Sequence, residues 1–392
     1  MSALRWPAIL LLGSLAACGG RPYVYEPLET LDLVARAESQ AAGKVRVSAS
    51  VPGAAETEAI FGVPLYKKGI QPVWLQVENG SGNRLRYAPV GTDRFYFSPL
   101  EVAWKHRGGF SKSGKRQMEQ HFHELAMDRY IPAGETRSGF VFTHARPGVK
   151  DFNVDLFSPE EFHYFTFLMR VPGFVPDYGN IDFAAMYAPE ELTIHDEAAF
   201  RAALKDLPCC SSNAAGDAEG NPINVILIGA GRDLLYTLLR ANWLETSADD
   251  ASRADDDYLY GRPQDATFRY GSSINDGHYE LKLWLAPLRL EDQSVALGQV
   301  KYVIDHRWII ARPDPDVDNA RNFMLQNLWY SQSLLKYGWI SGDEVVPVEN
   351  WWLSFQDDPY FTDGYRAVFW ISGQPVSLLE AESADWEALP RD

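Results

Sequence analysis

Two adjacent cysteines, Cys209 and Cys210, offer the most direct chemistry in this sequence of 392 residues. Paired thiols can form a disulfide, exchange with other thiols or bind a soft metal ion. Neighbouring Cα atoms lie about 3.8 Å apart, below the usual separation across a disulfide, so a bridge between these residues would be strained and easily reduced. The pair is therefore either a redox or metal-binding element or a structural one, in which a bridge stiffens the chain or both thiols are buried.

Three aspartates at alternate positions, Asp314, Asp316 and Asp318, are similar to the opening of a calcium-binding loop. The rest of that loop is missing, because Asn319 occupies the position that needs glycine and Leu325 the position that needs glutamate. An aspartate in front of a helix accepts hydrogen bonds from free backbone N–H groups and complements the helix dipole. We therefore expect these residues to begin a helix and predict no metal site, with a cation held by the three carboxylates as the alternative.

Three other segments approach known motifs without completing them. Residues 109–116 nearly match a phosphate-binding loop, but Arg116 replaces the serine or threonine that binds magnesium. The glycine turn at 229–231 lacks the third glycine of a dinucleotide site. His121 and His123 would diverge on a helix, because residues two apart do not share a helix face. The sequence accordingly predicts no cofactor and favours a protein without catalytic activity.

The N-terminus has the composition of an export signal. A cationic start precedes an apolar run that is too short to span a bilayer, and residues 15–18 then read Leu-Ala-Ala-Cys. This ending resembles the lipobox of bacterial lipoproteins, in which the cysteine is lipidated and becomes the first mature residue. The resemblance implies a signal peptide at 1–18 and acyl chains on Cys18 that hold the protein to a membrane. The residue after Cys18 is Gly19 and not aspartate, so the resemblance also implies sorting to the outer membrane, with the body of the protein in the periplasm.

The composition is that of a folded, acidic protein. Hydrophobic residues make up 46% of the chain and aromatic residues 13%, which is ample for a packed core, and the length suggests two domains. The formal net charge of −17 argues against a nucleic-acid partner, because binding to a phosphate backbone needs a basic surface. We therefore expect the partners to be a membrane, through Cys18, and other envelope proteins.

The first part of the body alternates apolar and polar residues, with frequent turns. Residues 19–43 have weak periodicity and are interpreted as a tether. The predicted strands are 44–51, 73–78, 84–90, 98–106, 138–144, 151–157 and 162–171. Short strands in this pattern favour an immunoglobulin-like β-sandwich over 44–190, with a helix-prone insertion at 112–129.

The second part, 195–375, mixes helices with longer strands. Its predicted elements are a strand at 223–228, a helix at 232–243, a hairpin of strands at 278–290 and 295–305, a helix at 317–337 and a strand at 365–371. The order β-α-β-β-α-β is that of the ferredoxin-like split unit, which packs two helices on one face of an antiparallel sheet. The predicted fold class is therefore α+β, a β-sandwich followed by an α+β sandwich, with a tail at 376–392.

Segments of the second part resemble the LssY C-terminal domain over roughly residues 205–340. They are 224–229, the Gly-Arg-Pro-Gln-Asp stretch at 261–265 and the Asp-Pro-Asp-Val-Asp stretch at 314–318. Members of this family occur as lipoproteins or fused behind a membrane phosphatase module, and they are labelled as candidate type I secretion components. The phosphatase module is absent from this chain, so the resemblance implies no phosphatase activity. Residues 310–313 also replace a Thr-His pair that is usual in the family.

Arg262 and Asp265 belong to the Gly-Arg-Pro-Gln-Asp stretch at 261–265. They form either an ion pair that fixes a loop or, with Asp314 and Asp316, the lining of a ligand groove. The leading hypothesis is a binding or assembly module. The alternatives are an enzyme acting on a lipid or cell-wall substrate and a secretion-system accessory. A deep cleft that gathers these side chains with His278 would favour the enzyme, whereas an exposed apolar patch would favour the binding module.

Overall fold

The computed structural model describes residues 20–27, 33–246, 256–271, 277–306, 309–342, 344–384 and 386–387. The predicted signal peptide and Cys18 lie outside this part of the chain. The structure has two compact units, Met1–Ala145 with Asn153–Phe165, and Arg146–Phe152 with Thr166–Asp392. Within the described ranges, no helix is both long and apolar enough to cross a membrane. Helices and largely antiparallel sheets occur in both units, which confirms the α+β class.

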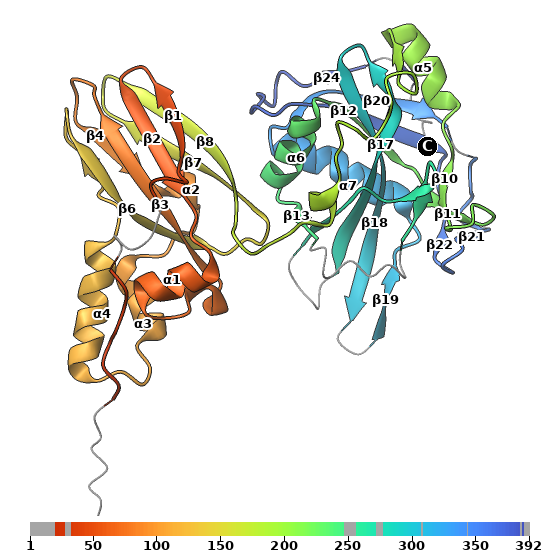
Figure 1. Cartoon of the computed structure of the whole chain (residues 1–392). Coiled ribbons are helices and arrows are strands. Elements are labelled where there is room, and N and C mark those ends of the chain that lie inside the picture. Colours follow the sequence, from red (N-terminus) through yellow and green to blue (C-terminus); the bar gives the residue numbers. More distant parts are fainter. Residues whose placement is uncertain are drawn as a thin grey trace, which may run out of the picture. The chain divides into compact units, whose positions relative to one another are not determined.

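The first unit contains two four-stranded sheets (Figure 1). One has the order β1-β2-β3-β6, antiparallel throughout, with β1 (Glu38–Ala42), β2 (Val45–Ser50), β3 (Ile70–Asn79) and β6 (Thr136–His144). The other has the order β5-β4-β7-β8, with β4 (Leu85–Ala88), β5 (Tyr130–Ile131), β7 (Val149–Phe157) and β8 (Phe162–Arg170). Residues 149–152 of β7 and 166–170 of β8 are assigned to the second unit. The predicted tether at 19–43 contains β1, whose five residues pair with β2. The structure differs from the prediction there.

Helices occupy the connections of the first unit. They are α1 (Ala54–Phe61), the 3₁₀ helix η2 (Leu65–Lys68), α2 (Pro89–Thr92), α3 (Pro99–His106) and α4 (Lys112–Glu124). The helix predicted in 112–129 is confirmed as α4. Its N-terminus is capped by Ser111, whose Oγ accepts a hydrogen bond from the N–H of Gly114 at 3.1 Å.

The strand predicted at 98–106 is wrong, because this segment forms α3. Leu100, Val102 and Trp104 alternate with polar or small residues and so imitate a strand. The local signals at the start of the segment decide otherwise. Ser98 Oγ accepts a hydrogen bond from a backbone N–H three residues on, and Pro99 stands at the first helical position, where its missing N–H costs nothing.

Aromatic side chains form the core between these helices and the first sheet. The ring of Phe61 in α1 lies 4.8 Å from that of Phe122 in α4, centroid to centroid. It also lies 5.2 Å from Phe140 and 5.3 Å from Phe142, both in β6. All four side chains are buried. The core of this unit therefore combines helix and strand residues.

The second unit is built on a mixed ten-stranded sheet (Figure 1). Its main path is β13-β16-β17-β18-β12-β23-β20-β24, with β19 paired to β18 and β9 paired to β17. The strands are β9 (Thr193–His195), β12 (Val225–Gly229), β13 (Leu244–Glu245), β16 (Ala266–Tyr270), β17 (His278–Leu290), β18 (Gln293–His306), β19 (Ile309–Pro313), β20 (Leu334–Ser341), β23 (Tyr365–Ile371) and β24 (Glu382–Ser383). The predicted hairpin is confirmed, since β17 and β18 pair antiparallel. β12 pairs antiparallel with β18 and parallel with β23.

Helices cover both faces of this sheet. They are the 3₁₀ helix η3 (Asp177–Asn180), α5 (Glu197–Lys205), α6 (Gly231–Arg240) and α7 (Val317–Tyr330). Leu238 of α6 and Met324 of α7 pack in one core with Val225 of β12. Phe200 of α5 packs in a second core with Ile228, whose side chain points to the other face of β12. α5 was not predicted from the sequence.

Two predicted boundaries in the second unit differ from the structure. The helix predicted at 317–337 ends at Tyr330, because Gln332 has a φ of 59° and the chain then turns into β20. The predicted tail at 376–392 contains β24, which pairs with β20. Trp386 in the same segment is buried, and its ring lies 4.9 Å from that of Trp370.

Candidate functional site

A small sheet of the second unit brings two of the predicted site segments together. It has the order β11-β10-β14-β15, with β10 (Cys210–Ser212), β11 (Glu219–Pro222), β14 (Tyr258–Leu259) and β15 (Arg262–Pro263). Ser212 pairs with Tyr258, and Leu259 pairs with Arg262. The cysteine pair and the Arg262 loop, distant in sequence, are therefore parts of one structure.

Arg262 and Asp265 form an ion pair with two hydrogen bonds, Nε to Oδ1 at 2.8 Å and Nη2 to Oδ2 at 3.0 Å. Arg262 also donates to the hydroxyl of Tyr187 at 2.7 Å and to the carbonyl of Leu285 at 2.6 Å. Asp265 Oδ2 accepts a further bond from the N–H of Leu285 at 2.6 Å. Although burial acts to lower it, hydrogen bonding to Asp265 raises the pKa of Arg262. These contacts hold the 261–265 loop against β17.

Asp314 and Asp316 lie at the start of α7. Asp316 Oδ1 accepts from the N–H of Asn319 at 2.9 Å, and Asp314 Oδ1 accepts from the N–H of Asp316 at 3.0 Å, which confirms the predicted helix start. Among the described residues, no hydrogen bond or ion pair joins Arg262 or Asp265 to these aspartates. The structure therefore places the four predicted groove residues in two separate networks.

The third aspartate of this motif, Asp318, is bound inside the protein. Its Oδ1 accepts from the hydroxyl of Thr362 at 2.9 Å, and its Oδ2 accepts from the N–H of Asp363 at 2.6 Å. Arg321, almost fully buried, makes two hydrogen bonds to Asp363, at 2.7 and 2.8 Å, and lies 3.2 Å from Asp318. Burial raises the pKa of Asp318. The carboxylate of Asp318, which a calcium-binding loop would use as a ligand, is therefore already bound to groups of the protein.

A buried ion pair that the sequence did not indicate holds β10 in place. Asp257 ends a run of three consecutive aspartates in the sequence, yet its side chain is fully buried, and the Nζ of buried Lys282 donates to it at 2.6 Å. The hydroxyl of Ser211 in β10 donates to the other carboxylate oxygen at 2.9 Å. The signal in the sequence was Lys282 itself, since a lysine at a buried strand position requires a countercharge.

Cys209 and Cys210 are joined by a disulfide. Both residues are partly exposed, and the exposed carboxylate of Glu219 in β11 approaches them, because its oxygen and the two Sγ atoms all lie within 4.8 Å of one another. The carbonyl of Cys209 accepts from the N–H of Ile223 at 2.8 Å, so strand pairing anchors the bridge. The carbonyl of Glu219 accepts from the N–H of Phe355 at 2.7 Å, which links β11 to a long loop.

We name this loop the tryptophan loop and define it as residues 344–361, between β20 and β23. It contains a two-stranded hairpin, β21 (Trp352–Leu353) and β22 (Pro359–Tyr360), close to β10 and β11 in Figure 1. Trp351 is 49% exposed and Leu353 66% exposed. The other exposed apolar side chains are Val345, Val348 and Trp352. The loop thus presents five large apolar side chains to solvent, of which those of residues 351–353 are consecutive.

The base of the tryptophan loop is anchored in the unit. Val346 and Tyr360 are buried in a small core with Val317 of α7. The ring of Trp351 stacks on that of Phe361 with centroids 6.1 Å apart. The exposed side chains are therefore carried on a fixed support. The adjacent Trp351 and Trp352 were the available sequence signal, but large apolar residues are usually buried, and no sequence motif indicates that these two are exposed.

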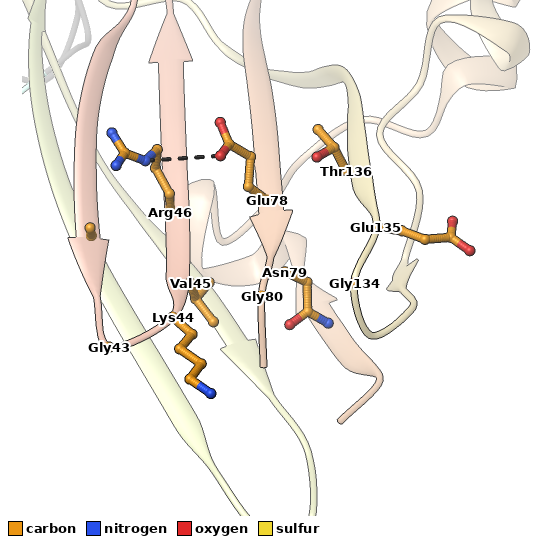
Figure 2. Close-up of a pocket in the computed structure, with 11 residues that line it drawn as sticks. Gly43, Lys44, Val45, Arg46, Glu78, Asn79, Gly80, Gly134, Glu135 and Thr136 are labelled. Atoms are coloured by element: carbon orange, nitrogen blue, oxygen red, sulfur yellow. Dashed lines mark ion pairs between the residues drawn. The ribbon is translucent and has the colours of Figure 1, made fainter. Parts of the chain in front are cut away.

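A hollow of about 420 Å³ lies at one end of the first sheet in the first unit (Figure 2). Arg46 of β2 and Glu78 of β3 point toward one another across it, 3.9 Å apart, and both are largely exposed. Asn79 directs its amide nitrogen to the carbonyl oxygens of Asn83, at 2.8 Å, and Ile131, at 3.0 Å. The amide nitrogen of Asn79 is thus bound within the protein. The hollow is lined by side chains of both charges, and we assign no ligand to it.

Buried carboxylates form a further polar group in the second unit. Asp177 accepts from the N–H of Thr267 at 2.7 Å, and burial raises the pKa of Asp177 to about 6. Glu245 accepts from the hydroxyl of Tyr178 and from the N–H of Val149, the latter at 2.5 Å. Burial also raises the pKa of Glu245. Both carboxylates are bound to protein donors and join β13 and β16 to η3.

Buried histidines occur in the first unit. His121 Nε2 lies 2.9 Å from the carbonyl of Ile60, and its ring stacks on Tyr25 at 3.6 Å. His106 Nδ1 lies 2.9 Å from the carbonyl of Val102. Burial lowers the pKa of both histidines. They are thus neutral core residues at pH 7.

No family model and no curated protein matches this chain. The choice among the candidate sites therefore depends on their geometry. The arginine, aspartate and histidine side chains described above are bound to other protein groups, whereas the tryptophan loop directs its large side chains to solvent. The tryptophan loop, with the neighbouring cysteine pair, is the best candidate for a functional site.

Proposed function

We propose that this protein is a bacterial envelope lipoprotein that binds a partner polypeptide through its tryptophan loop. Acyl chains on Cys18 would hold it to the outer membrane, with its body in the periplasm. The partner would be another envelope protein that presents a basic and apolar segment. The function is binding or assembly, and no catalytic step is assigned to the chain.

The exposure of the tryptophan loop is the observation that carries this proposal. Trp351, Trp352 and Leu353 are consecutive and exposed, and tryptophan is enriched at the centres of protein interfaces. Their fixed support lowers the entropy lost on binding. An exposed apolar patch on a folded unit is the feature expected of a binding module.

Charge indicates the chemistry of the partner. The segment 341–365 contains no lysine, arginine or histidine, and it carries acidic residues on both sides of the two tryptophans, including Glu344, Glu349 and Asp357. A partner with lysine or arginine beside apolar residues complements this surface. Tryptophan faces also attract such cations.

The state of the polar candidates supports binding over catalysis. Arg262, Asp265 and Asp316 each make hydrogen bonds to groups of the protein itself. A catalytic group would need to reach a substrate atom. Arg262 and Asp265 instead hold the 261–265 loop in place, and Asp316 caps the N-terminus of α7.

The family and the finer fold are part of the same proposal. We assign the second unit to the LssY C-terminal type and its central strands to a split β-α-β-β-α-β unit. The neighbour order β17-β18-β12, antiparallel throughout, supports this assignment, whereas β23 pairs parallel with β12 and departs from the antiparallel sheet of that unit. For the first unit we propose an immunoglobulin-like sandwich of its two four-stranded sheets.

A peptide titration tests the binding function. The full-length chain is titrated with a synthetic peptide of lysine and leucine, and with a matched peptide in which glutamate replaces lysine, while calorimetry and tryptophan emission are recorded. We expect binding of the basic peptide only. Truncating a central interface tryptophan typically costs about 2 kcal/mol or more, so a Trp351→Ala and Leu353→Ala double variant should bind at least tenfold more weakly.

Trp104→Ala provides the matched control, because Trp104 is 53% exposed but lies on α3 in the first unit. This variant should bind the basic peptide as the wild type does. Equal binding of the two peptides, or an unchanged affinity in the double variant, would show that the tryptophan loop is not the binding surface.

Metabolic labelling with palmitate tests the membrane attachment. The wild-type protein should incorporate label and fractionate with the outer membrane. Cys18→Ser should remove the label completely, because acyl transfer requires the thiol at that position. A labelled Cys18→Ser protein would contradict the lipoprotein assignment, while Cys210→Ser serves as the control that retains the label.

A further inference from the structure

We propose that the reduced pair Cys209 and Cys210 binds a thiophilic divalent cation of the Zn²⁺ class, together with Glu219. The two sulfur atoms and one carboxylate oxygen would supply three ligands and leave a fourth position open. This site is independent of partner binding by the tryptophan loop. Metal binding is one of the alternatives that the sequence leaves open for this cysteine pair.

The geometry of the three ligand atoms supports the site. They come from two paired strands, β10 and β11, and all lie within 4.8 Å of one another. Zn²⁺ binds thiolate sulfur at about 2.3 Å and carboxylate oxygen at about 2.1 Å, which places neighbouring ligands of a tetrahedral ion about 3.5 Å apart. Rotation of the cysteine side chains after reduction and of the exposed Glu219 side chain would bring the three atoms to this spacing.

The disulfide contributes little to the stability of the fold, which also supports a role in binding. A disulfide stabilises a protein mainly by closing a loop in the unfolded chain, and the effect decreases with loop length. Cys209 and Cys210 are separated by one position, so their bridge constrains almost nothing. Strand pairing and the bond from Ser211 to Asp257 hold this segment without it. Reduction therefore releases two thiols, whose side chains can rotate apart while strand pairing holds the backbone of this segment in place.

The strand pairing also directs Glu219 toward the sulfurs. Cys210 pairs with Pro222 and Ser212 pairs with Glu219, so β11 has one more residue than β10 between the two pairs. Such bulges bend a strand and re-aim its side chains, and they occur often beside functional sites. Without a ligand at the sulfurs, this irregularity has no evident use in the sheet.

The chemistry proceeds in two balanced steps. A dithiol reductant of the envelope attacks the bridge, the bond between the two sulfurs breaks, and two electrons and two protons pass to them, while the reductant leaves as its own disulfide. The cation then displaces both thiol protons and binds the thiolates and the Glu219 carboxylate. The three negative charges suit a divalent ion, and thiolate ligands select soft or borderline metals over calcium or magnesium.

Cadmium titration of the full-length chain tests the proposal, with Cd²⁺ as the spectroscopic probe for Zn²⁺. The chain carries Cys18→Ser, so that Cys209 and Cys210 are its two remaining thiols. It is reduced with a phosphine, which is then removed, and the ultraviolet charge-transfer band from thiolate to cadmium is recorded. We expect one Cd²⁺ per chain for the reduced protein, displaced by Zn²⁺, and no band for the same protein in its oxidised form.

Two carboxylate variants test the third ligand. Glu219→Gln should weaken binding at least tenfold while the charge-transfer band is retained. Asp217→Asn is the matched control, because Asp217 is also exposed and lies two residues away, bound to Asn213. It should leave the affinity unchanged. Absence of the band in the reduced protein, one cation per two chains, or equal affinity in Glu219→Gln and the wild type would overturn the proposal.

Discussion

In the first unit burial lowers the pKa of the two core histidines, which contact backbone carbonyls, whereas the second unit encloses paired charges. His121 rests on the carbonyl of Ile60, within a core of aromatic rings. In the second unit, Lys282 donates to fully buried Asp257, and Arg321 binds Asp363 through two hydrogen bonds. A neutral buried group needs one hydrogen-bond partner, while a buried charge needs its countercharge as well. The stability of the second unit therefore depends on buried ion pairs, and that of the first unit on the packing of its apolar side chains.

This difference relates to what each unit positions. The second unit has to hold short strands and loops, such as β10 and the 261–265 loop, that contain few apolar residues of their own. Ion pairs and directional hydrogen bonds fix such segments where side-chain packing cannot. In the first unit, helices and long strands supply enough apolar surface to do so.

The largest effect that would break the comparison is expected for Asp257→Ala. The substitution leaves the Lys282 ammonium buried without its carboxylate, which typically costs about 3 to 5 kcal/mol of unfolding free energy. Denaturant titration followed by near-ultraviolet circular dichroism measures the loss. A second variant, Asp257→Ala with Lys282→Met, should recover most of it. If Asp257→Ala alone costs less than about 1 kcal/mol, the pair is not a main support of β10.

A smaller effect should distinguish the units by their response to acid. Burial lowers the pKa of His121, so the unfolded chain takes up a proton first as the pH falls through about 6.5, and stability decreases. Burial raises the pKa of Asp177 to about 6, so the folded chain takes up a proton first and stability increases as the pH falls through that value. Between pH 7 and 5 the Asp177 contribution is on the order of 1 kcal/mol.

Denaturant titrations at pH 7 and pH 5 separate the two contributions. His121→Gln should remove a loss of stability at pH 5, and Asp177→Asn should remove a gain. The two variants should therefore shift the pH dependence of the wild type in opposite directions. Shifts in the same direction would show that the two units do not differ in this way.

The smallest effect is expected for Arg36→Ala in the first unit. Arg36 binds Glu56 through two hydrogen bonds, at 2.6 and 2.7 Å, but both side chains are partly exposed. Exposed pairs contribute about 0 to 1 kcal/mol, because water and salt screen the charges. The same titration should detect a loss below about 1 kcal/mol that decreases further at high salt. A loss as large as that of Asp257→Ala would remove the distinction between the units.

Much of the fold could be predicted where one pattern extends over many residues. The hairpin of β17 and β18 followed from alternation along both strands, and the start of α7 followed from Asp316 and its neighbours. The segment of α3 was predicted as a strand, because its apolar residues alternate, and only Ser98 and Pro99 at its start indicate a helix. Local capping signals decide in such short segments.

The candidate site was harder to predict, because its parts come together through tertiary pairing. The cysteine pair was singled out from the sequence with a reactive and a structural role both open, but Glu219 was not, since only the pairing of β10 with β11 brings it to the cysteines. The burial of Asp257 was not predicted, because its partner Lys282 lies on a strand 25 residues away in the sequence. Contacts between segments far apart in sequence leave little local trace.

The tryptophan loop joins two neighbouring antiparallel strands, so its ends are closed by the sheet itself. Ser341 pairs with Tyr365, and the N–H of Gly342 donates to the carbonyl of Gly364 at 3.2 Å. Closing a loop costs only about 0.6 kcal/mol more for each doubling of its length, so longer or altered loops burden the fold little. Residues between these closed ends can be exchanged or inserted while the sheet persists. The same scaffold could thus acquire new partners by changing this one segment.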